Sequence, residues 1–398
     1  MRPRIALFCH SLTGTGGTER VIATLSQLLS SRYEVFEVSF DPPSSRRHFE
    51  SPAEFCPLGP SIQVPLPLRP ITYIRDAYRL WRFKRRSGIQ LTISNLWRAD
   101  LLSILSLGSD RKISICHINI VGNARNRLLF RLRGLASRIY RRFDRIVSVS
   151  SPLADEIRWL FALAPSQCHV IHNCVIGRPS TPESNAVERK KIRVVWCGRM
   201  VEEKNVLSLV PIFAEAHAKN PDLQLILIGD GALRSEVLGS LEQHGLRVSA
   251  DFENHDCDVV LTGFVDDPVQ LVARCDFQVL TSIAEGLGMV LIEGFSVGLP
   301  ALASDCSGGG VHDAMGGHFP FQAGRIHAEK TDGGFLLPVP DRSGPEARAF
   351  WVSAILQLAG DQALRKQLSE SARERALLFS PEVIAPRWFR LLDEILES

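Results

Sequence analysis

The 398-residue chain lacks several features that define narrower classes of protein. It has no run of about 18 apolar residues, so no membrane-spanning helix is expected. Its N-terminus shows no apolar stretch followed by a small-residue cleavage site, so we expect no secretory leader. The nine scattered cysteines include no C-x-x-C pair, which argues against a disulfide framework or a zinc ribbon and suits a reducing cytoplasm. No repeat with a period of about 20–50 residues occurs, which argues against a solenoid.

Acidic residues are scarce in the first 150 positions. This part has 24 Lys and Arg but 10 Asp and Glu, a balance of +14, whereas the remainder has 22 and 33, a balance of −11. The formal net charge of +3 therefore conceals two unlike halves. Such asymmetry predicts that the N-terminal half meets an anionic surface. The hydrophobic fraction of 45% excludes disorder as the main state.

Short apolar strands alternate with helical patterns on both sides of a polar, proline-containing segment. This alternation predicts an α/β fold with two doubly wound, Rossmann-like domains whose ligands bind beyond the C-terminal ends of the strands, in the cleft between the domains. The predicted boundaries are a first domain over 1–178, a linker over 179–191, a second domain over 192–378 and a C-terminal helix over 379–398. Residues 41–70 are predicted to be irregular, and a strand over 170–174 is predicted to end the first half.

The strongest motif is Glu285-Gly-Leu-Gly-Met-Val-Leu-Ile-Glu293, which follows an apolar strand. Gly286 and Gly288 permit tight backbone where a helix begins, and the first helical amides form a ready site for phosphate. Glu285 precedes this helix and Glu293 lies two turns inside it. Because carboxylates accept hydrogen bonds from sugar hydroxyls, a polyol ligand fits. The alternative is a solvated helix with two incidental glutamates, although Glu293 stands in an apolar stretch.

A second loop, Gly198-Arg-Met-Val-Glu-Glu-Lys-Asn205, also follows a strand. Arg199 and Lys204 would lie at the C-terminal end of that strand, where two cations can neutralise a diphosphate. For either residue alone, a charged surface turn is the alternative. Gly229-Asp-Gly231 is a weaker signal for close approach of a ligand, and the backbone of Thr262-Gly-Phe-Val265 suits recognition of a flat base edge.

Taken together, these segments resemble the glycosyltransferase family 4 enzymes, which are retaining transferases of the GT-B fold. The motifs at 198–205, 229–231 and 285–293 occur in the family's order and spacing, as does Ala303-Ser-Asp-Cys-Ser-Gly-Gly-Gly310. Gly16-Gly-Thr-Glu-Arg-Val21 also matches. The resemblance covers nearly the whole chain, and it implies that the C-terminal helix crosses back to the first domain.

The resemblance also implies roles for individual residues. Arg199 and Lys204 would bind the donor diphosphate, and Glu285 would bind hydroxyls of the transferred sugar. Glu293 would bind the donor ribose. His117, which follows the strand 112–116, matches the family's histidine near the transferred sugar. The implied catalytic set is Arg199, Lys204, Glu285 and His117. The implied donor-binding set is Gly16, Gly17, Gly198, Asn205, Gly229, Asp230, Phe264, Val265, Gly286, Leu287, Gly288, Met289, Val290 and Glu293. The role of His10, at another strand end, stays open.

The reaction implied by the resemblance is sugar transfer from a nucleotide diphosphate sugar, with UDP favoured over GDP. The acceptor would be a hydroxyl of a lipid-linked saccharide or of a polysaccharide or lipopolysaccharide precursor. The acceptor hydroxyl would attack the face that the diphosphate leaves, giving retention, and no covalent nucleophile is assigned. We expect no cofactor and no metal. Asp256-Cys-Asp258 has the D-x-D form of metal-dependent transferases but is better interpreted as a solvated loop.

Two basic segments of the first half, 75–86 and 125–145, interleave arginines with apolar residues. Cationic amphipathic helices lie on anionic lipid headgroups, so we expect peripheral attachment at the cytoplasmic face of a membrane. The alternative is a solvated helix whose apolar side packs in the core. Nucleic acid is not an expected partner, because no recognised nucleic-acid motif is present.

Two other classes of function compete with transfer. An NAD-dependent enzyme is disfavoured, because the G-x-G-x-x-G pattern that begins at Gly14 would need glycine where Glu19 stands. A non-catalytic two-domain nucleotide-binding protein stays open. A degenerate transferase of that kind would be expected to lose Lys204 or Glu285, and both are present.

Overall fold

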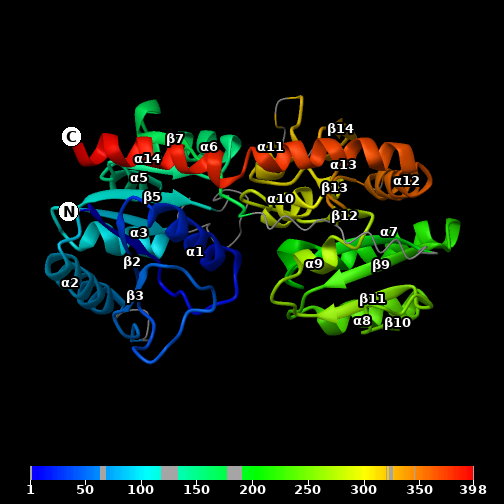
Figure 1. Ribbon diagram of the computed structural model, residues 1–398, viewed down its shortest axis with the longest axis horizontal. Helices are drawn as coiled ribbons and strands as arrows, with labels where there is room; N and C mark the ends of the chain where they lie inside the picture. Colours follow the sequence, from blue (N-terminus) through cyan, green and yellow to red (C-terminus); the bar gives the residue numbers. More distant parts are fainter. Residues whose placement is uncertain are drawn as a thin grey trace. The chain divides into compact units, whose positions relative to one another are not determined.

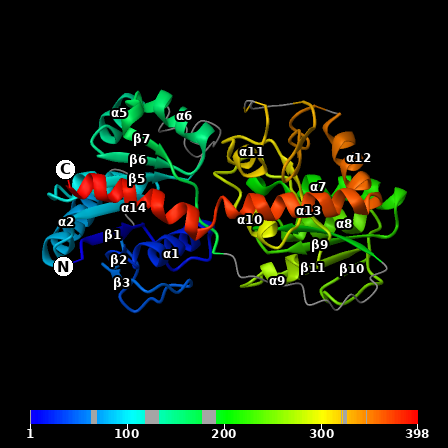
Figure 2. The ribbon, with the colours of Figure 1, turned by 45° about the horizontal axis from the view of Figure 1, so that its top comes forward.

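The computed structural model describes residues 2–62, 69–117, 133–176, 191–319, 321, 326–344 and 346–397. The chain divides into two compact units. The first unit is Met1–Ile176 with Ser380–Ser398, and the second unit is Gly177–Phe379. Each unit is an open β-sheet with helices packed against it (Figures 1 and 2).

The first unit holds a parallel sheet in the order β3-β2-β1-β4-β5-β6-β7. Its strands are β1 (Arg4–Phe8), β2 (Glu34–Ser39), β3 (Glu54–Pro57), β4 (Leu91–Asn95), β5 (Arg111–Cys116), β6 (Arg145–Ser148) and β7 (Cys168–Val170). Its helices are α1 (Gly17–Leu29), α2 (Arg69–Ser87), α3 (Trp97–Leu105), α5 (Arg133–Tyr140), α6 (Ser151–Phe161) and α14 (Pro381–Glu397), with a 3-10 turn over Pro165–Gln167. Both faces of β1 are covered, which explains why its residues 5–8 are all apolar and fully buried.

Two details of the first unit differ from the sequence-based expectation. The segment 41–70 contains the edge strand β3, which pairs with β2. The strand expected over 170–174 lies over Cys168–Val170 instead. Both strands are three or four residues long and only partly buried, so neither carries the apolar pattern that marks the central strands.

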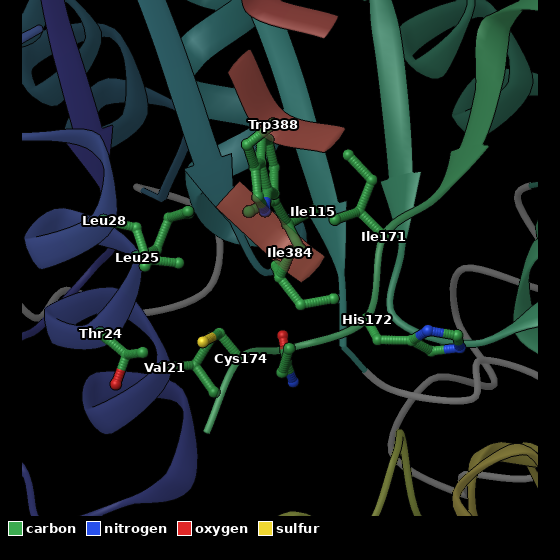
Figure 3. A pocket seen from close by; sticks show the side chains of 11 residues that line it. Val21, Thr24, Leu25, Leu28, Ile115, Ile171, His172, Cys174, Ile384 and Trp388 are labelled. Atoms are coloured by element: carbon green, nitrogen blue, oxygen red, sulfur yellow. The ribbon is translucent and has the colours of Figure 1, made fainter. Parts of the chain in front are cut away.

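The C-terminal helix α14 packs within the first unit. The Tyr33 hydroxyl donates a hydrogen bond of 2.8 Å to Asp393, and Arg32 forms an ion pair of 2.9 Å with the same carboxylate. Figure 3 shows an apolar pocket of the first unit, lined by Ile384 and Trp388 of α14 and by residues of α1. Helix α14 therefore completes the apolar core of the first unit, although it follows the second unit in the sequence.

The second unit holds a sheet in the order β10-β11-β9-β8-β12-β13-β15-β14. Its strands are β8 (Ile192–Cys197), β9 (Leu223–Ile228), β10 (Val248–Ser249), β11 (Val259–Gly263), β12 (Phe277–Leu280), β13 (Ala301–Ser304), β14 (Glu329–Thr331) and β15 (Gly334–Leu337). Its helices are α7 (Val206–Lys219), α8 (Arg234–Gln243), α9 (Val269–Val272), α10 (Met289–Ser296), α11 (Gly310–Met315), α12 (Ala347–Gly360) and α13 (Gln362–Leu377), with a 3-10 turn over Glu202–Lys204. The pairs are parallel except at one edge, where β14 and β15 form an antiparallel pair.

Alternate side chains of β8 enter different apolar clusters. Val194 and Trp196 pack with Phe213 of α7 and Trp351 of α12, whereas Val195 packs with Val272 of α9 on the opposite face. Because both faces are buried, residues 194–197 of the strand form a continuous apolar run. The predicted doubly wound α/β architecture is confirmed in both units.

Candidate active site

Four loops of the second unit leave the same edge of its sheet. Strands β8, β9, β12 and β13 run parallel, so their C-terminal ends meet at one edge, here called the second carboxyl edge. The loops that follow these strands cover residues 198–205, 229–233, 281–288 and 305–309. Folding therefore brings together the motifs that were predicted to bind the donor.

Backbone hydrogen bonds join these loops to one another. The amide of Met200 donates to the carbonyl of Asp230 at 2.8 Å, which links the first loop to the second. The amide of Ile283 donates to the carbonyl of Glu203 at 2.9 Å, which links the first loop to the third. The loops thus form one connected structure, and a ligand would meet a preorganised surface.

Two glycines are required where these loops approach most closely. Gly229 has φ +139°, and a Cβ atom placed on it would lie 1.9 Å from the carbonyl oxygen of Gly198. A Cβ atom on Gly310 would lie 1.8 Å from the carbonyl oxygen of Gly286. No side chain fits at either distance, so these motif glycines are explained by contact between backbones.

Lys204 and Glu285 form the central ion pair of the second carboxyl edge. Lys204 Nζ lies 2.5 Å from Glu285 Oε1, and the two side chains are 25% and 11% exposed. Ser282 Oγ donates to the same carboxylate oxygen at 2.7 Å. The cation predicted to bind diphosphate and the carboxylate predicted to bind sugar hydroxyls are therefore in direct contact.

Arg199 differs from Lys204 in its electrostatic surroundings. Its side chain is exposed on the same loop, and the described residues offer it no hydrogen bond or ion pair. Its positive charge is thus available to an anion, whereas the charge of Lys204 is already balanced by Glu285. Together these two side chains supply a cationic surface that a diphosphate would complement.

Helix α10 begins beside this ion pair. Its N-cap is Gly288, with φ +79°, and no side chain caps the first amides. Met289 and Val290 of the first turn are partly exposed, whereas Leu287 and Glu293 are buried. The uncapped amides and the positive end of the helix dipole suit a phosphate group, and Leu287 would reach a ligand only through its backbone.

Three other predicted donor contacts lie on neighbouring loops. Asp230 is exposed, and its carboxylate accepts a hydrogen bond of 2.7 Å from the amide of Gly231. Phe264 is exposed after β11, whereas Val265 packs against an apolar cluster. Asn205 adopts a left-handed conformation with φ +52° at the start of α7. These residues lie on loops around the second carboxyl edge, but some of their side chains already contact other parts of the protein.

The D-x-D segment has a structural role at one of its two carboxylates. Asp256 is exposed, as expected for a solvated loop. Asp258 is buried, which corrects the expectation for that residue, because Arg247 binds its carboxylate at 2.8 and 3.0 Å. The hydrogen bonds from Arg247 lower the pKa of Asp258 to about 2. Within the described residues, no group of three or more His, Cys, Asp or Glu side chains is arranged to hold a metal ion.

The remaining predicted residues belong to the first unit. Gly16 and Gly17 begin α1, and the carboxylate of Glu19 folds back over Gly16, where an added Cβ atom would lie 2.6 Å from its oxygen. His117 is buried after β5, and its Nε2 lies 2.8 Å from Asn95 Oδ1. Burial lowers the pKa of His117 to about 4, so its imidazole is neutral near pH 7.

The hydrogen bond from Asn95 to the end of β1 determines which nitrogen of His117 carries the proton. Asn95 Nδ2 donates to the carbonyl of Phe8 at 3.4 Å, so Oδ1 faces His117 and accepts from Nε2–H. The lone pair of Nδ1 is then available to accept a hydrogen bond from a hydroxyl. Asn95, Trp97 and Arg98 were not identified from the sequence. The available signal was a tryptophan and an arginine placed directly after a buried strand.

Some cationic side chains of the basic segment 75–86 form ion pairs within the first unit. Arg75 and Arg79 bind the buried carboxylate of Asp76, and the buried Lys84 pairs with Asp110 at 2.9 Å. Burial lowers the pKa of Lys84 to about 8. In the predicted segment 125–145, residues up to 132 lie outside the described residues. No described helix combines the length and the apolar character needed to cross a membrane.

Comparison with known families gives consistent matches over both units. Residues 15–176 match the model described as Glycosyltransferase Family 4, and residues 191–335 match the model described as Glycosyl transferases group 1. A Campylobacter jejuni N-acetylgalactosamine-N,N'-diacetylbacillosaminyl-diphospho-undecaprenol 4-alpha-N-acetylgalactosaminyltransferase is 26% identical, over 77% of this chain and 82% of the relative. The amylovoran biosynthesis glycosyltransferase AmsD of Erwinia amylovora is 23% identical, over 98% of this chain and 99% of the relative.

Solved structures match the whole fold. Sucrose-phosphate synthase from Thermosynechococcus elongatus aligns with a TM-score of 0.77 and 19% identity, covering 100% of both chains. Anabaena Alr3699/HepE, solved in complex with UDP and glucose, aligns with a TM-score of 0.68 and 17% identity, covering 98% of this chain and 100% of the other. At these identities the likeness concerns the fold, and the predicted GT-B fold is confirmed.

Proposed function

We propose, from the premise that this chain belongs to the family 4 glycosyltransferases, that it transfers a sugar from a nucleoside diphosphate sugar, UDP rather than GDP, to a saccharide hydroxyl with retention. The observation that carries the proposal is the Lys204–Glu285 ion pair beside Arg199 and the uncapped start of α10. Cations and uncapped helix amides at one edge would suit a diphosphate, and the carboxylate next to them would suit sugar hydroxyls, which supports the proposal.

The ion pair suggests how the donor would engage. Negative charge builds on the leaving diphosphate as the anomeric bond breaks, and Lys204, Arg199 and the start of α10 would stabilise that charge. Lys204 would exchange Glu285 for a phosphate oxygen on binding. The released carboxylate of Glu285 would then accept hydrogen bonds from the transferred sugar. Attack by the acceptor on the departing face requires no covalent nucleophile, and the contributions of His117, Gly16 and Gly17 remain predictions.

The proposed acceptor is a lipid-linked saccharide or a precursor of a surface polysaccharide. The Campylobacter jejuni relative is named for a diphospho-undecaprenol acceptor, and the Erwinia amylovora relative for the biosynthesis of amylovoran. A complex with UDP and glucose has been solved for the Anabaena neighbour, which supports the preference for a UDP-sugar.

The donor is tested by thermal stabilisation of the purified chain with UDP, GDP and their common sugars. A ligand at about 100 times its Kd stabilises a folded protein by roughly 2.7 kcal/mol, so the preferred nucleotide should raise Tm most. For each nucleotide sugar that stabilises the chain, release of the nucleoside diphosphate is then measured. Stabilisation by UDP-sugars with release of UDP supports the proposal. Stabilisation without release from any donor would instead support a non-catalytic nucleotide-binding protein.

We also propose that the first unit attaches to an anionic membrane surface, at the cytoplasmic face, through helix α2. Ile71, Ile74 and Tyr78 are 64%, 69% and 57% exposed and share one face of this helix, and Tyr78 stacks on Trp81 with ring centroids 5.5 Å apart. Arg85 lies over the same Trp81 ring. Figure 1 shows α2 at the periphery of the first unit. An apolar ridge beside exposed arginines is the pattern of helices that lie on anionic lipid headgroups.

Attachment is tested by co-sedimentation with phosphatidylglycerol vesicles and with phosphatidylcholine vesicles. Binding should require the anionic lipid and weaken at high salt, because the Debye length falls to about 3 Å at 1 M. Replacing Ile71, Ile74 and Tyr78 by serine should abolish it. Trp159→Ser, which alters an exposed aromatic of α6, is the matched control and should bind normally. Equal binding of the triple variant would refute the role of α2.

A further inference from the structure

Three neighbouring strands of the first unit deliver polar side chains to one edge of its sheet. Strands β1, β4 and β5 are adjacent and parallel, so His10, Asn95 and His117 leave the sheet at the same edge, here called the first carboxyl edge. The His117–Asn95 hydrogen bond ties two of these strands together. Arg98 follows Asn95 in the first turn of α3. None of the motifs assigned to the donor accounts for His10 or Arg98.

Arg98 carries a positive charge that the described part of the chain does not neutralise. Its guanidinium lies over the ring of Tyr73 of α2, 5.6 Å from the centroid, and forms no ion pair or hydrogen bond with the described residues. Its Nε atom is buried without a hydrogen-bond partner. A buried donor without a partner is costly, and the Nε side of a guanidinium is an edge that binds phosphate through two parallel hydrogen bonds.

His10 presents a second buried polar atom at the same edge. Its Nδ1 atom has no hydrogen-bond partner among the described residues. Burial and the nearby charge of Arg98 lower the pKa of His10, whereas Asp76 and Asp41 act in the opposite direction. The two side chains follow strands β1 and β4, which are paired in the sheet. Two unpaired polar atoms that follow adjacent strands, Nδ1 of His10 and Nε of Arg98, suit a site that a polar ligand completes.

Leu96 holds this turn in a strained conformation. Its φ of +72° with ψ of 149° is a combination that residues other than glycine rarely adopt. The turn leaves the neighbouring Trp97 side chain 46% exposed while the Arg98 Nε atom is buried. Backbone strain of this kind persists where the surroundings enforce it, and it concentrates at ligand-binding sites. An exposed indole next to a half-buried guanidinium offers an apolar face beside an anion-binding edge.

We propose that Arg98 and His10 bind a phosphate group of the acceptor, and that Trp97 packs against the adjoining part of the same molecule. This inference rests on the proposed transferase function and specifies its acceptor as a phosphate-bearing saccharide. Arg98 supplies the charge and the paired hydrogen bonds, and the neutral His10 supplies one further hydrogen bond. The first carboxyl edge would then recognise the phosphate of the acceptor, while the second carboxyl edge holds that of the donor.

The test separates acceptor recognition from donor chemistry. Hydrolysis of the nucleotide sugar in the absence of acceptor measures the donor site, and Arg98→Gln should leave it within about twofold of the unaltered chain. Binding of geranylgeranyl diphosphate in detergent measures the acceptor site. Arg98→Gln should weaken this binding roughly 10- to 100-fold, because a charged hydrogen-bond partner is lost. Binding of geranylgeraniol, which lacks phosphate, should be the same in both proteins.

Several variants make the result specific. Arg98→Lys keeps the charge without the two-pronged edge and should bind the diphosphate with intermediate strength, which also guards against a folding defect in Arg98→Gln. Arg138→Gln removes an exposed arginine of α5 and should bind normally. Lys204→Ala should also bind the lipid diphosphate normally, which shows that the probe does not occupy the donor site.

Competition experiments also identify the source of the phosphate. Competition by glucose 1-phosphate at concentrations similar to the lipid probe would assign a soluble phosphosaccharide, whereas competition only by the lipid diphosphate would assign a lipid-linked acceptor. Equal binding of the diphosphate by Arg98→Gln and the unaltered chain would overturn the inference. Absence of donor hydrolysis in every protein, together with absence of stabilisation by any nucleotide or nucleotide sugar, would instead overturn the transferase function and leave the binding result interpretable.

Discussion

Each of the two carboxyl edges brings together polar groups that follow neighbouring parallel strands, but the two edges are built differently. The second is built from contiguous loops whose backbones touch at Gly229 and Gly310, and its central charges are paired as Lys204 and Glu285. The first is assembled from single side chains that follow different strands. It keeps His117 neutral by burial and leaves Arg98 without a carboxylate among the described residues. Close backbone contacts require glycine, so the second edge can be recognised as a motif in the sequence. Isolated side chains that follow different strands form no such motif.

The charge of the two halves extends this comparison. The first 150 residues carry a balance of +14 and the remainder a balance of −11. The second edge must therefore concentrate positive charge locally, through Arg199, Lys204 and the start of α10. In the first unit the background is already cationic, and the proposed anion site there needs one arginine without a carboxylate beside it.

The largest expected effect is on the charged pair of the second edge. Lys204→Ala should lower sugar transfer roughly 100- to 1,000-fold, because a charge that stabilises the leaving diphosphate is lost. The fold should be unchanged, since Lys204 lies in a partly exposed loop. Lys219→Ala, which breaks an exposed ion pair with Glu215 in α7, is the control and should retain full activity. Near-normal turnover of Lys204→Ala would remove this residue from the proposed mechanism.

The next effect is on the backbone contacts of the second edge. Gly229→Ala should destabilise the second unit by roughly 2–4 kcal/mol, because a Cβ atom would overlap the carbonyl of Gly198 and strain a positive φ. Gly239→Ala in α8 is the matched control. No atom lies within 4 Å of its added Cβ, so it should stabilise that unit by roughly 0.5–1 kcal/mol. Urea unfolding measures both, and equal stability of the two variants would contradict the steric argument.

A smaller effect tests the neutrality of the first edge. His117 has a pKa of about 4 in the folded chain against 6.5 ordinarily, so the unfolded chain binds more protons between these values. Its contribution to stability is therefore complete above pH 6.5 and is lost as the pH falls towards 4. We expect this to cost on the order of 1–3 kcal/mol in the free energy of unfolding.

The variant His117→Gln isolates this contribution, because glutamine can still donate a hydrogen bond to Asn95 and does not titrate. Its unfolding free energy should fall less than that of the unaltered chain between pH 6.5 and 4. His244→Gln replaces an exposed histidine of the second unit and should follow the unaltered chain. Parallel pH profiles for all three proteins would show that His117 is not held neutral.

The smallest effect concerns the attachment of α14. Tyr33→Phe removes the hydrogen bond to Asp393 and should cost the first unit about 1 kcal/mol. Hydrogen exchange should become faster in α14 and remain unchanged in α7 of the second unit. Tyr78→Phe removes an exposed hydroxyl of α2 and should change neither helix. Faster exchange in both units would contradict the assignment of α14 to the first.

Much of this organisation was predictable from local patterns. The apolar runs of the central strands predicted a doubly wound α/β fold, because strands buried on both faces are apolar throughout. Short or partly exposed strands such as β3 were not predicted, because they have too few residues to show an apolar pattern. The second edge was predictable because its glycines and charges are consecutive. Asn95, Trp97 and Arg98 were not identified, because the role of a residue that follows a strand depends on its neighbours in space.

The sequence by itself determined the α/β class, the restart of the pattern after the linker and the motifs of the second carboxyl edge, since each is a property of adjacent residues. Only the tertiary structure decided which distant groups meet. Lys204 and Glu285, 81 positions apart, became an ion pair, and Asp258 became a buried partner of Arg247 rather than a solvated carboxylate. His117 became a neutral imidazole and Arg98 a charge without a carboxylate beside it. The physical reason is that burial and pairing depend on neighbours in space, and those neighbours are set by the order of the strands in the sheet.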